Sequence, residues 1–178
     1  MSTTQKDVAA VICAGSFFMP AHYKALIDTL QARGIIAEAP TLPSNAIIDV
    51  SATDSTNPEL DDPQTDSWPN GAEDVAAVQG RIAALADRGH KVIVVGHSYG
   101  GFVATQSASP ELQHATRQKS GRPGGVIGIL YLAGVVLPKG VDIDTYFTPH
   151  EDAKHLPPLV QLHVSLATRT HSKVHRIL

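Results

Sequence analysis

The stretch from Lys91 to Gly101, KVIVVGHSYGG, constrains the fold of this chain more than any other. It begins with the β-branched run Val92–Val95, which is typical of a strand buried on both faces. A Gly-His-Ser-Tyr-Gly turn and an apolar helical pattern follow. A strand, a G-x-S-x-G turn and a helix in this order expose a serine hydroxyl at a strained turn, where Gly96 and Gly100 provide clearance. The pattern predicts that Ser98 is a nucleophile; the competing interpretation is an incidental serine in a Gly-rich turn.

Apolar runs on both sides of this turn alternate with helical patterns. Val8–Ala14 is a continuous apolar run, and Ile35–Ala39 is a second, shorter one. Between them, Ala21–Arg33 has apolar residues at helical spacing, which predicts a right-handed crossover between two parallel strands. A further helix is predicted from Gly71 to Gly89, and a fourth strand at Val126–Ala133. The chain is therefore expected to be an α/β protein with a doubly wound parallel sheet.

The GHSYGG turn resembles the nucleophile elbow of the α/β-hydrolase superfamily, and the order and spacing of the predicted elements agree with it. The sequence looks most similar to small serine esterases and to hydroxynitrile-lyase-like members. The resemblance extends from about Val8 to Pro138, so the sheet is expected to lack the C-terminal strands of that fold. Two regions are predicted: an α/β-hydrolase core over residues 1–140, and a partial cap or altered C-terminal tail over residues 141–178.

The resemblance also implies an oxyanion hole, in which backbone N–H groups stabilise negative charge on a carbonyl oxygen. In α/β-hydrolases one donor directly follows the nucleophile, and here that residue is Tyr99. The other comes from the turn after the first strand, where many relatives have His-Gly before the donor. This sequence has Ala14 and Gly15 there, which places the second donor at Ser16, with Phe17 as the alternative. An ordinary turn between strand and helix is the competing interpretation.

A serine nucleophile needs a base that takes its proton and a carboxylate that orients the base. In the superfamily both residues follow later strands, and no such strand–helix unit is predicted after residue 141. The best-placed carboxylates are Asp142 and Asp144, shortly after the fourth strand. The candidate bases are His150 and His155, with His163 as a further candidate, although each also fits a surface histidine.

A long acidic segment, Thr41–Pro69, separates the second predicted strand from the next helix and contains no Lys or Arg. This composition predicts a surface loop, which we expect beside the substrate entrance. Asp61 and Asp62 are adjacent within it, but no histidine or further ligand pattern accompanies them. No metal site is therefore predicted, and no organic cofactor is implied.

The composition indicates which classes of partner and which cellular compartment to expect. The 178 residues, with 43% hydrophobic and 17% charged side chains, are typical of one globular domain. A formal charge of −3 gives no reason to expect nucleic acid or an anionic membrane as a partner, and no apolar run approaches the length of a membrane span. The N-terminus lacks a signal-peptide pattern, and the single Cys13 suits a reducing compartment. A cytoplasmic location is expected.

These observations predict serine-dependent hydrolysis of an ester or similar acyl bond in a small-molecule substrate, through an acyl-enzyme on Ser98. A lyase or another cofactor-free enzyme that uses the same elbow is one alternative. The other is a truncated, catalytically impaired relative that acts as a non-enzymatic binding protein. If no strand follows Val126–Ala133, this apolar strand is an exposed sheet edge, and self-association through it is expected.

Overall fold

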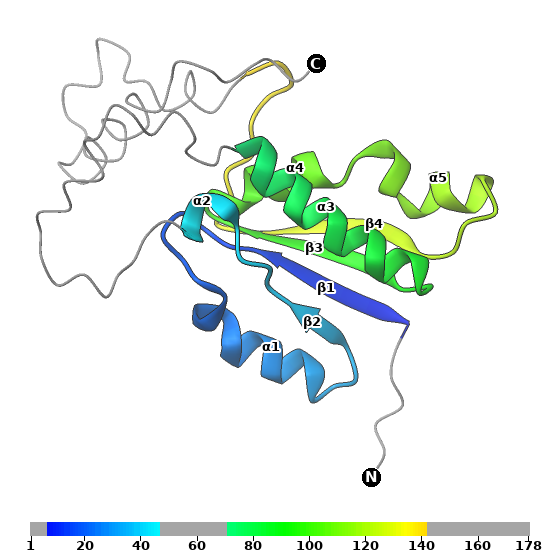
Figure 1. Ribbon diagram of the computed structural model, residues 1–178, viewed down its shortest axis with the longest axis horizontal. Coiled ribbons are helices and arrows are strands. Elements are labelled where there is room, and N and C mark those ends of the chain that lie inside the picture. Colours follow the sequence, from blue (N-terminus) through cyan, green and yellow to red (C-terminus); the bar gives the residue numbers. More distant parts are fainter. Residues whose placement is uncertain (1–6, 47–70, 142–178) are drawn as a thin grey trace, which may run out of the picture. The chain divides into compact units, whose positions relative to one another are not determined.

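The computed structural model describes residues 7–46 and 71–141, which are built on a four-stranded parallel sheet (Figure 1). The strands are adjacent in the order β2-β1-β3-β4, and every neighbouring pair is parallel. This confirms the α/β class and the parallel sheet predicted from the sequence. The strand bounds are β1 (Val8–Cys13), β2 (Ile36–Glu38), β3 (Lys91–His97) and β4 (Gly125–Leu132).

The two central strands, β1 and β3, are paired along their whole shared length. Their register runs from Val8 opposite Lys91 to Cys13 opposite Gly96. The carboxyl ends of both strands therefore coincide, and the turns that leave them begin side by side. In parallel sheets this edge is where functional groups usually gather.

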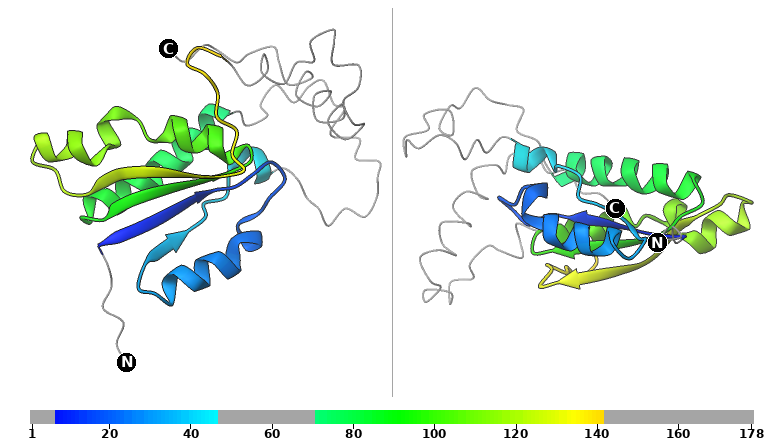
Figure 2. Two further views of the ribbon diagram at one scale, coloured as in Figure 1. Left: turned by 180° about the vertical axis from the view of Figure 1, so that it is seen from behind. Right: turned by 90° about the horizontal axis from the view of Figure 1, so that it is seen from below.

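Helix α3 (Gly71–Asp87) covers the centre of the sheet and contacts β1, β3 and β4 (Figures 1 and 2). Its Val78, Ile82 and Leu85 are fully buried, which matches the stripe expected from their helical spacing. Helix α4 (Gly100–Ser107) packs against α3 and against β3, the strand that precedes it. The strands and these two helices supply most of the buried apolar residues.

The first helix differs from the expected Ala21–Arg33. The chain forms a 3₁₀ turn, η1 (Pro20–Tyr23), and then the shorter α-helix α1 (Lys24–Gln31), which lies beside β2 (Figure 1). No residue of α1 is fully buried, and Leu26 of the predicted apolar stripe is 36% exposed. The helix is shorter because Pro20 opens a tighter turn, in which Tyr23 points into the core.

The expectation of a surface loop over Thr41–Pro69 is wrong for its first part. Helix α2 (Pro43–Ala46) is a single helical turn, and both Leu42 and Asn45 are buried. Leu42 belongs to the hydrophobic core, and Asn45 hydrogen-bonds to the backbone of the loop after β1, so this stretch packs inward. Residues 47–70, which include Asp61 and Asp62, lie outside the described part of the chain, as does the predicted C-terminal region except for Val141.

Strand β4 is an edge strand among the residues that the structure describes, because its one strand partner there is β3. Its outer half is exposed: Ile127 is 47% and Leu130 51% accessible. An open groove of about 570 Å³ runs along this strand and is bounded by α4 and by α5 (His114–Lys119). Apolar side chains of β4 are therefore exposed at the surface.

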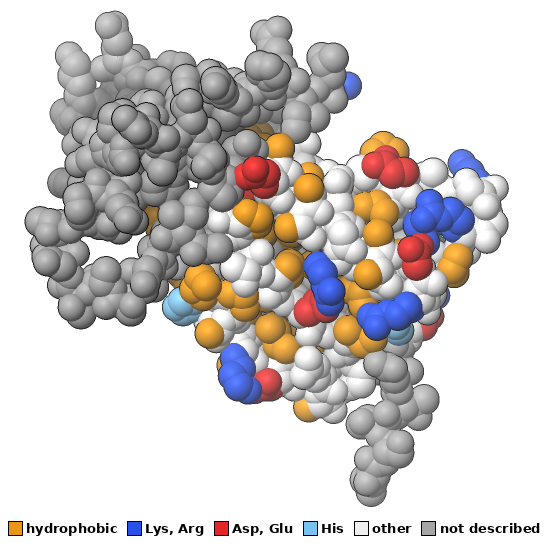
Figure 3. All heavy atoms as spheres, viewed as in Figure 1, with side chains coloured by type: hydrophobic (Ala, Val, Ile, Leu, Met, Phe, Trp, Pro, Cys, Tyr) orange, Lys and Arg blue, Asp and Glu red, His pale blue; other side chains and the backbone are white. Residues whose placement is uncertain are grey.

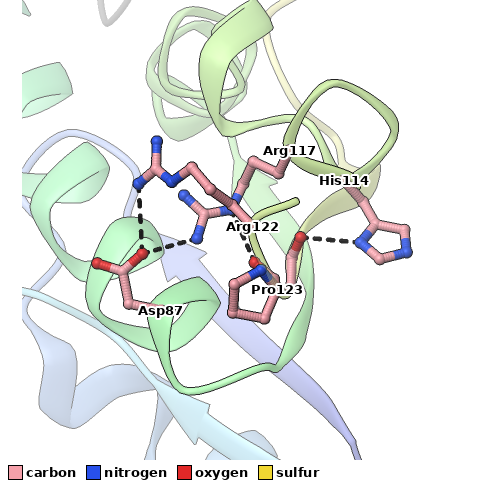
Figure 4. Close-up of polar contacts among 6 residues, drawn as sticks. Asp87, His114, Arg117, Arg122 and Pro123 are labelled. Atoms are coloured by element: carbon pink, nitrogen blue, oxygen red, sulfur yellow. Dashed lines mark hydrogen bonds and ion pairs between the residues drawn. The ribbon is translucent and has the colours of Figure 1, made fainter. Parts of the chain in front are cut away.

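The Arg117 side chain connects α5 with the end of α3 and with the segment before β4 (Figure 4). Its side chain is fully buried, and its Nη2 lies 2.6 Å from Oδ1 of Asp87, the last residue of α3. Its Nε donates a hydrogen bond to the carbonyl oxygen of Pro123, just before β4. The hydrogen bond from Arg117 lowers the pKa of the Asp87 carboxyl, and Arg122 lies 3.4 Å from the same oxygen. These contacts connect the end of α3 with the start of β4.

Acidic and basic side chains are intermixed on the face drawn in Figure 3. Lys24 forms an ion pair with Asp28, and Arg81 forms a bidentate ion pair with Glu38.

Within residues 7–46 and 71–141, no helix combines the length and the apolar character that a membrane span requires.

Candidate active site

Ser98 occupies the turn between β3 and α4 with a φ of 53°, in the left-handed region that residues with a side chain rarely adopt. Three backbone hydrogen bonds hold it there. Its N–H donates to the Leu132 carbonyl at 3.3 Å, and its own carbonyl accepts from Gly101 at 2.9 Å and from Val135 at 2.8 Å. Such a conformation persists only where the surroundings maintain it, and here β4 and the loop after it do so.

Gly100 allows α4 to start directly against the end of β1. A Cβ at this position would clash with the Cys13 carbonyl oxygen and would lie 2.6 Å from that of Ala14. A Cβ at Gly96 would lie 2.6 Å from the Cα of Gly101, where strand and helix cross. Both glycines therefore provide the clearance that the sequence pattern predicts.

The loop after β1 passes directly against the Ser98 turn. A Cβ at Gly15 would lie 3.1 Å from the Ser98 Cβ and 3.1 Å from Nδ1 of His97. No side chain at residue 15 separates the loop backbone from the serine. The structure therefore brings Ser98 and Tyr99 together with the loop that contains Ser16 and Phe17.

Asn45 of α2 holds this loop through its side-chain amide. Its Nδ2 donates to the carbonyl oxygens of Gly15 and Phe18, each at 3.0 Å. Its Oδ1 accepts the Phe17 N–H at 3.1 Å, and Phe17 has a φ of 67°. Among the described residues, the intervening Ser16 N–H has no hydrogen-bond partner, and neither has the Tyr99 N–H across the turn.

Asp74, in the first turn of α3, is fully buried and receives three hydrogen bonds. The Ser44 N–H donates to its Oδ1 at 2.9 Å, while the Ser44 hydroxyl donates to its Oδ2. The Tyr99 hydroxyl also donates to Oδ2, at 2.8 Å. Burial, reinforced by the nearby Asp74 carboxylate, raises the pKa of Tyr99. The Tyr99 side chain therefore serves as a neutral hydrogen-bond donor that anchors the turn containing Ser98.

His97 directly precedes Ser98, but its ring is enclosed by aromatic residues of the first loop. The Phe18 ring meets it edge-on, with centroids 5.1 Å apart, and the Tyr23 ring lies at 5.9 Å. The Tyr23 hydroxyl accepts the Gly15 N–H at 3.1 Å. His97 therefore packs against the loop and helps to fix its position.

The sequence profile described as the Alpha/beta hydrolase family matches residues 10–173. The chain belongs to the alpha/beta hydrolase family. It is 26% identical over 145 residues to the Alpha/beta hydrolase nvfD of Aspergillus novofumigatus (strain IBT 16806), an alignment that covers 79% of this chain and 48% of nvfD. The chain thus spans about half the length of this curated relative. The crystal structure of tomato Methylketone Synthase I complexed with 2-tridecanone is similar with a TM-score of 0.49 and 17% identity, over 78% of this chain and 44% of that one.

The described residues include the Ser98 turn and the loop after β1, which form the part of the candidate site that comes early in the chain. The candidate acids and bases predicted from the sequence lie outside the described residues: Asp142, Asp144, His150 and His155. Within residues 7–46 and 71–141, no group of three or more His, Cys, Asp and Glu side chains is arranged to hold a metal ion.

Sequence reasoning missed two residues that surround the candidate site, Asn45 and Asp74. Asn45 follows the carboxyl end of β2, at the same edge of the sheet as Ser98, which is a signal for a site residue. The sequence around Asp74 predicts only the start of a helix, which acidic residues in the first turn favour. Nothing in the local sequence indicates that Asp74 is buried.

Proposed function

We propose that this alpha/beta hydrolase cleaves an ester or similar acyl bond of a small molecule, with Ser98 as the nucleophile. The observation that carries the proposal is the left-handed Ser98 in a strand–turn–helix, with the backbone of Gly15 packed against its side chain. Ser98 Oγ would attack the carbonyl carbon while a base takes its proton. The bond to the leaving group then breaks, the base returns the proton to the leaving oxygen, and water hydrolyses the acyl-enzyme.

The N–H groups of Ser16 and Tyr99 are the proposed donors to the oxyanion. Both lack a hydrogen-bond partner among the described residues and so remain available to a ligand. The Phe17 N–H already donates to Asn45, which favours Ser16 over Phe17. A preorganised donor of this kind accelerates acyl transfer by about 10²–10³.

The remaining parts of the mechanism rest on the sequence. His150 and His155 are the proposed bases, and Asp142 and Asp144 the proposed acids. A cytoplasmic location belongs to the same proposal and is supported by the single cysteine, Cys13, which is buried as a free thiol.

A fluorophosphonate probe tests the nucleophile, because it reacts with an activated serine and leaves a stable adduct. We expect labelling of the full chain at Ser98, and its loss in Ser98→Ala. Ser109→Ala is the matched control, since the Ser109 hydroxyl donates to Glu111, and this variant should be labelled like the wild type. Labelling that persists in Ser98→Ala would overturn the assignment. A folded wild type that is not labelled would favour the non-enzymatic binding protein.

A further inference from the structure

We propose that a relay of three residues, Asp74–Ser44–Asn45, whose Asp74 and Asn45 are buried, positions both oxyanion donors of this site. The inference rests on the proposed function, because it assigns a task to residues around the proposed oxyanion hole. All three are positioning residues: Asp74 holds the Tyr99 hydroxyl and Ser44, and Asn45, the residue after Ser44, holds the backbone of the loop after β1.

The relay begins at Asp74, whose carboxylate accepts hydrogen bonds from Tyr99 on one side of the site and from Ser44 on the other. Oδ2 accepts the Tyr99 hydroxyl at 2.8 Å, which fixes the residue that follows the nucleophile. Oδ1 accepts the Ser44 N–H at 2.9 Å, and the Ser44 hydroxyl also binds Oδ2, which fixes α2. One buried carboxylate therefore sets the spacing between the nucleophile turn and α2.

The relay continues from α2 to the loop after β1 through Asn45, which is only 3% exposed. Its amide makes three hydrogen bonds to the backbone of Gly15, Phe17 and Phe18, on both sides of Ser16. The Ser16 peptide is thereby held from both neighbours while its own N–H stays unpaired within the described residues. Asn45 thus bonds backbone groups before and after Ser16, and by holding both neighbours it orients the Ser16 N–H.

The geometry has a catalytic consequence because oxyanion donors act only when aimed at the place where charge develops. A displacement of about 1 Å in a positioning group lowers rates by about 10²-fold. Substrate binding in the ground state depends far less on this alignment. Disturbing the relay should therefore lower kcat and leave KM nearly unchanged.

Asn45→Ala and Asn45→Asp test the loop side of the relay. Asn45→Asp keeps the shape and the acceptor for the Phe17 N–H, but it places a carboxylate against the Gly15 and Phe18 carbonyl oxygens. For both variants we expect kcat per probe-reactive Ser98 to fall on the order of 10²-fold, with KM within about twofold. The affinity for a trifluoromethyl ketone, which forms an oxyanion on the serine, should fall by a similar factor.

Gln113→Ala is the matched control, because it removes a side-chain amide that bonds to the Ala108 carbonyl at an exposed position. It should leave all three quantities at wild-type values. Dividing the turnover by the amount of probe-labelled Ser98 separates a loss of positioning from partial unfolding. Partial unfolding lowers the number of labelled sites, whereas a loss of positioning lowers the turnover of each site. Amide hydrogen exchange gives a readout without activity: Asn45→Ala should speed exchange at Phe17 and leave Val94 in β3 unchanged.

The outcomes separate this inference from the proposed function. A wild type labelled at Ser98, together with Asn45 variants of unchanged kcat per site and unchanged ketone affinity, would overturn the relay alone. A wild type that is never labelled at Ser98 would overturn the proposed function, and the relay as a catalytic device with it.

Discussion

The hydroxyl of Tyr23 lies 2.8 Å from Nδ1 of His97, although 74 residues separate the two in the chain. The same hydroxyl accepts the Gly15 N–H, so it joins η1, the loop after β1 and the last residue of β3. Since the hydroxyl proton is free to be donated to Nδ1, the arrangement favours the His97 tautomer protonated on Nε2. A single oxygen atom thus fixes one wall of the candidate site.

Tyr23→Phe should lower the free energy of unfolding by about 1–3 kcal/mol, because it leaves the Gly15 N–H without its partner in a buried position. Tyr131→Phe is the control, since the Tyr131 hydroxyl bonds to Thr105 at an exposed position, and its effect should stay within about 0.5 kcal/mol. Urea denaturation of the three proteins provides the measurement. Equal changes in the free energy of unfolding for the two substitutions would show that the buried Tyr23 hydroxyl stabilises the fold no more than the exposed Tyr131 hydroxyl does.

Gly100→Ala should destabilise the fold by about 1–3 kcal/mol, because a methyl group there collides with the backbone at the end of β1. Gly80→Ala is the matched control in the interior of α3, where a Cβ meets no atom within 4 Å. That substitution should stabilise the protein by about 1 kcal/mol through helix propensity. Thermal and urea unfolding would reveal the opposite signs, and a neutral Gly100→Ala would contradict the close approach.

Stability should decline at alkaline pH, partly because of Cys13. Burial raises the pKa of the Cys13 thiol from 9.0 to about 12. The raised pKa stabilises the folded protein fully below pH 9, and this contribution is lost as the pH rises from about 9 toward 12. Between pH 8 and pH 10 this one thiol should account for a loss of about 1.4 kcal/mol.

Cys13→Ala isolates that contribution. Burial also raises the pKa of Tyr23 and of Tyr99, so both proteins should lose further stability as the pH approaches and passes about 10. Urea unfolding at pH 8 and pH 10 should show the smaller decline in Cys13→Ala. Identical declines would mean that the thiol keeps an ordinary pKa in the fold.

Activity should depend on one histidine of the C-terminal segment. None of the four histidines in residues 7–46 and 71–141 is hydrogen-bonded to Ser98. His22 binds the Met19 backbone, His97 binds Tyr23, His114 binds the Gly124 carbonyl, and the Nδ1 of His90 has no partner among these residues. Either His150→Ala or His155→Ala should reduce p-nitrophenyl acetate turnover to the residual level of about 10³–10⁴ over water that remains when a triad member is removed.

His114→Ala is the control for the histidine scan, because its ring hydrogen-bonds to the Gly124 carbonyl next to the start of β4, at the opposite end of that strand from Leu132. If the wild type itself turns over at that residual level and no histidine matters, the catalytically impaired binding protein becomes the better reading. If His163→Ala alone abolishes turnover, the base has been assigned to the wrong residue.

Among the described residues β4 is an edge strand with exposed apolar side chains, and such an edge favours pairing with another strand, so the chain should self-associate at micromolar concentration. Leu130→Lys places a charge on this edge and should shift the protein toward the monomer. Leu26→Lys, on α1, is the control for a charge added at an exposed leucine elsewhere. Sedimentation that shows a stable wild-type monomer would rule out an open edge.

Much of the fold could be predicted because the strands are continuous apolar runs. Val8–Ala14 and Val92–Val95 coincide with β1 and the middle of β3, and the glycines of the GHSYGG turn have the steric role expected of them. The start of α1 was placed too early, because η1 and α1 together share one helical spacing. Local patterns do not distinguish the two kinds of helical turn.

The sequence predicts only those parts of the candidate site whose residues are close together in the chain. Ser98 and Tyr99 belong to one turn, whereas Asn45 hydrogen-bonds to Gly15 across 30 residues, and Ser44 to Asp74 across another 30. Such contacts depend on how α2 packs against α3 and against the loop after β1. A polar residue in an acidic stretch gives no local sign of that packing.

The left-handed Ser98 also has a consequence for the order in which the protein assembles. Two of its three backbone hydrogen bonds come from Leu132 and Val135, which the ribosome adds after β3 and α4 are complete. A nascent chain that ends at α4 therefore contains the serine without the partners that keep its turn strained. If Ser98 is the nucleophile, as proposed, its reactive conformation depends on the docking of β4, and a serine-directed probe would report that this strand has joined the sheet.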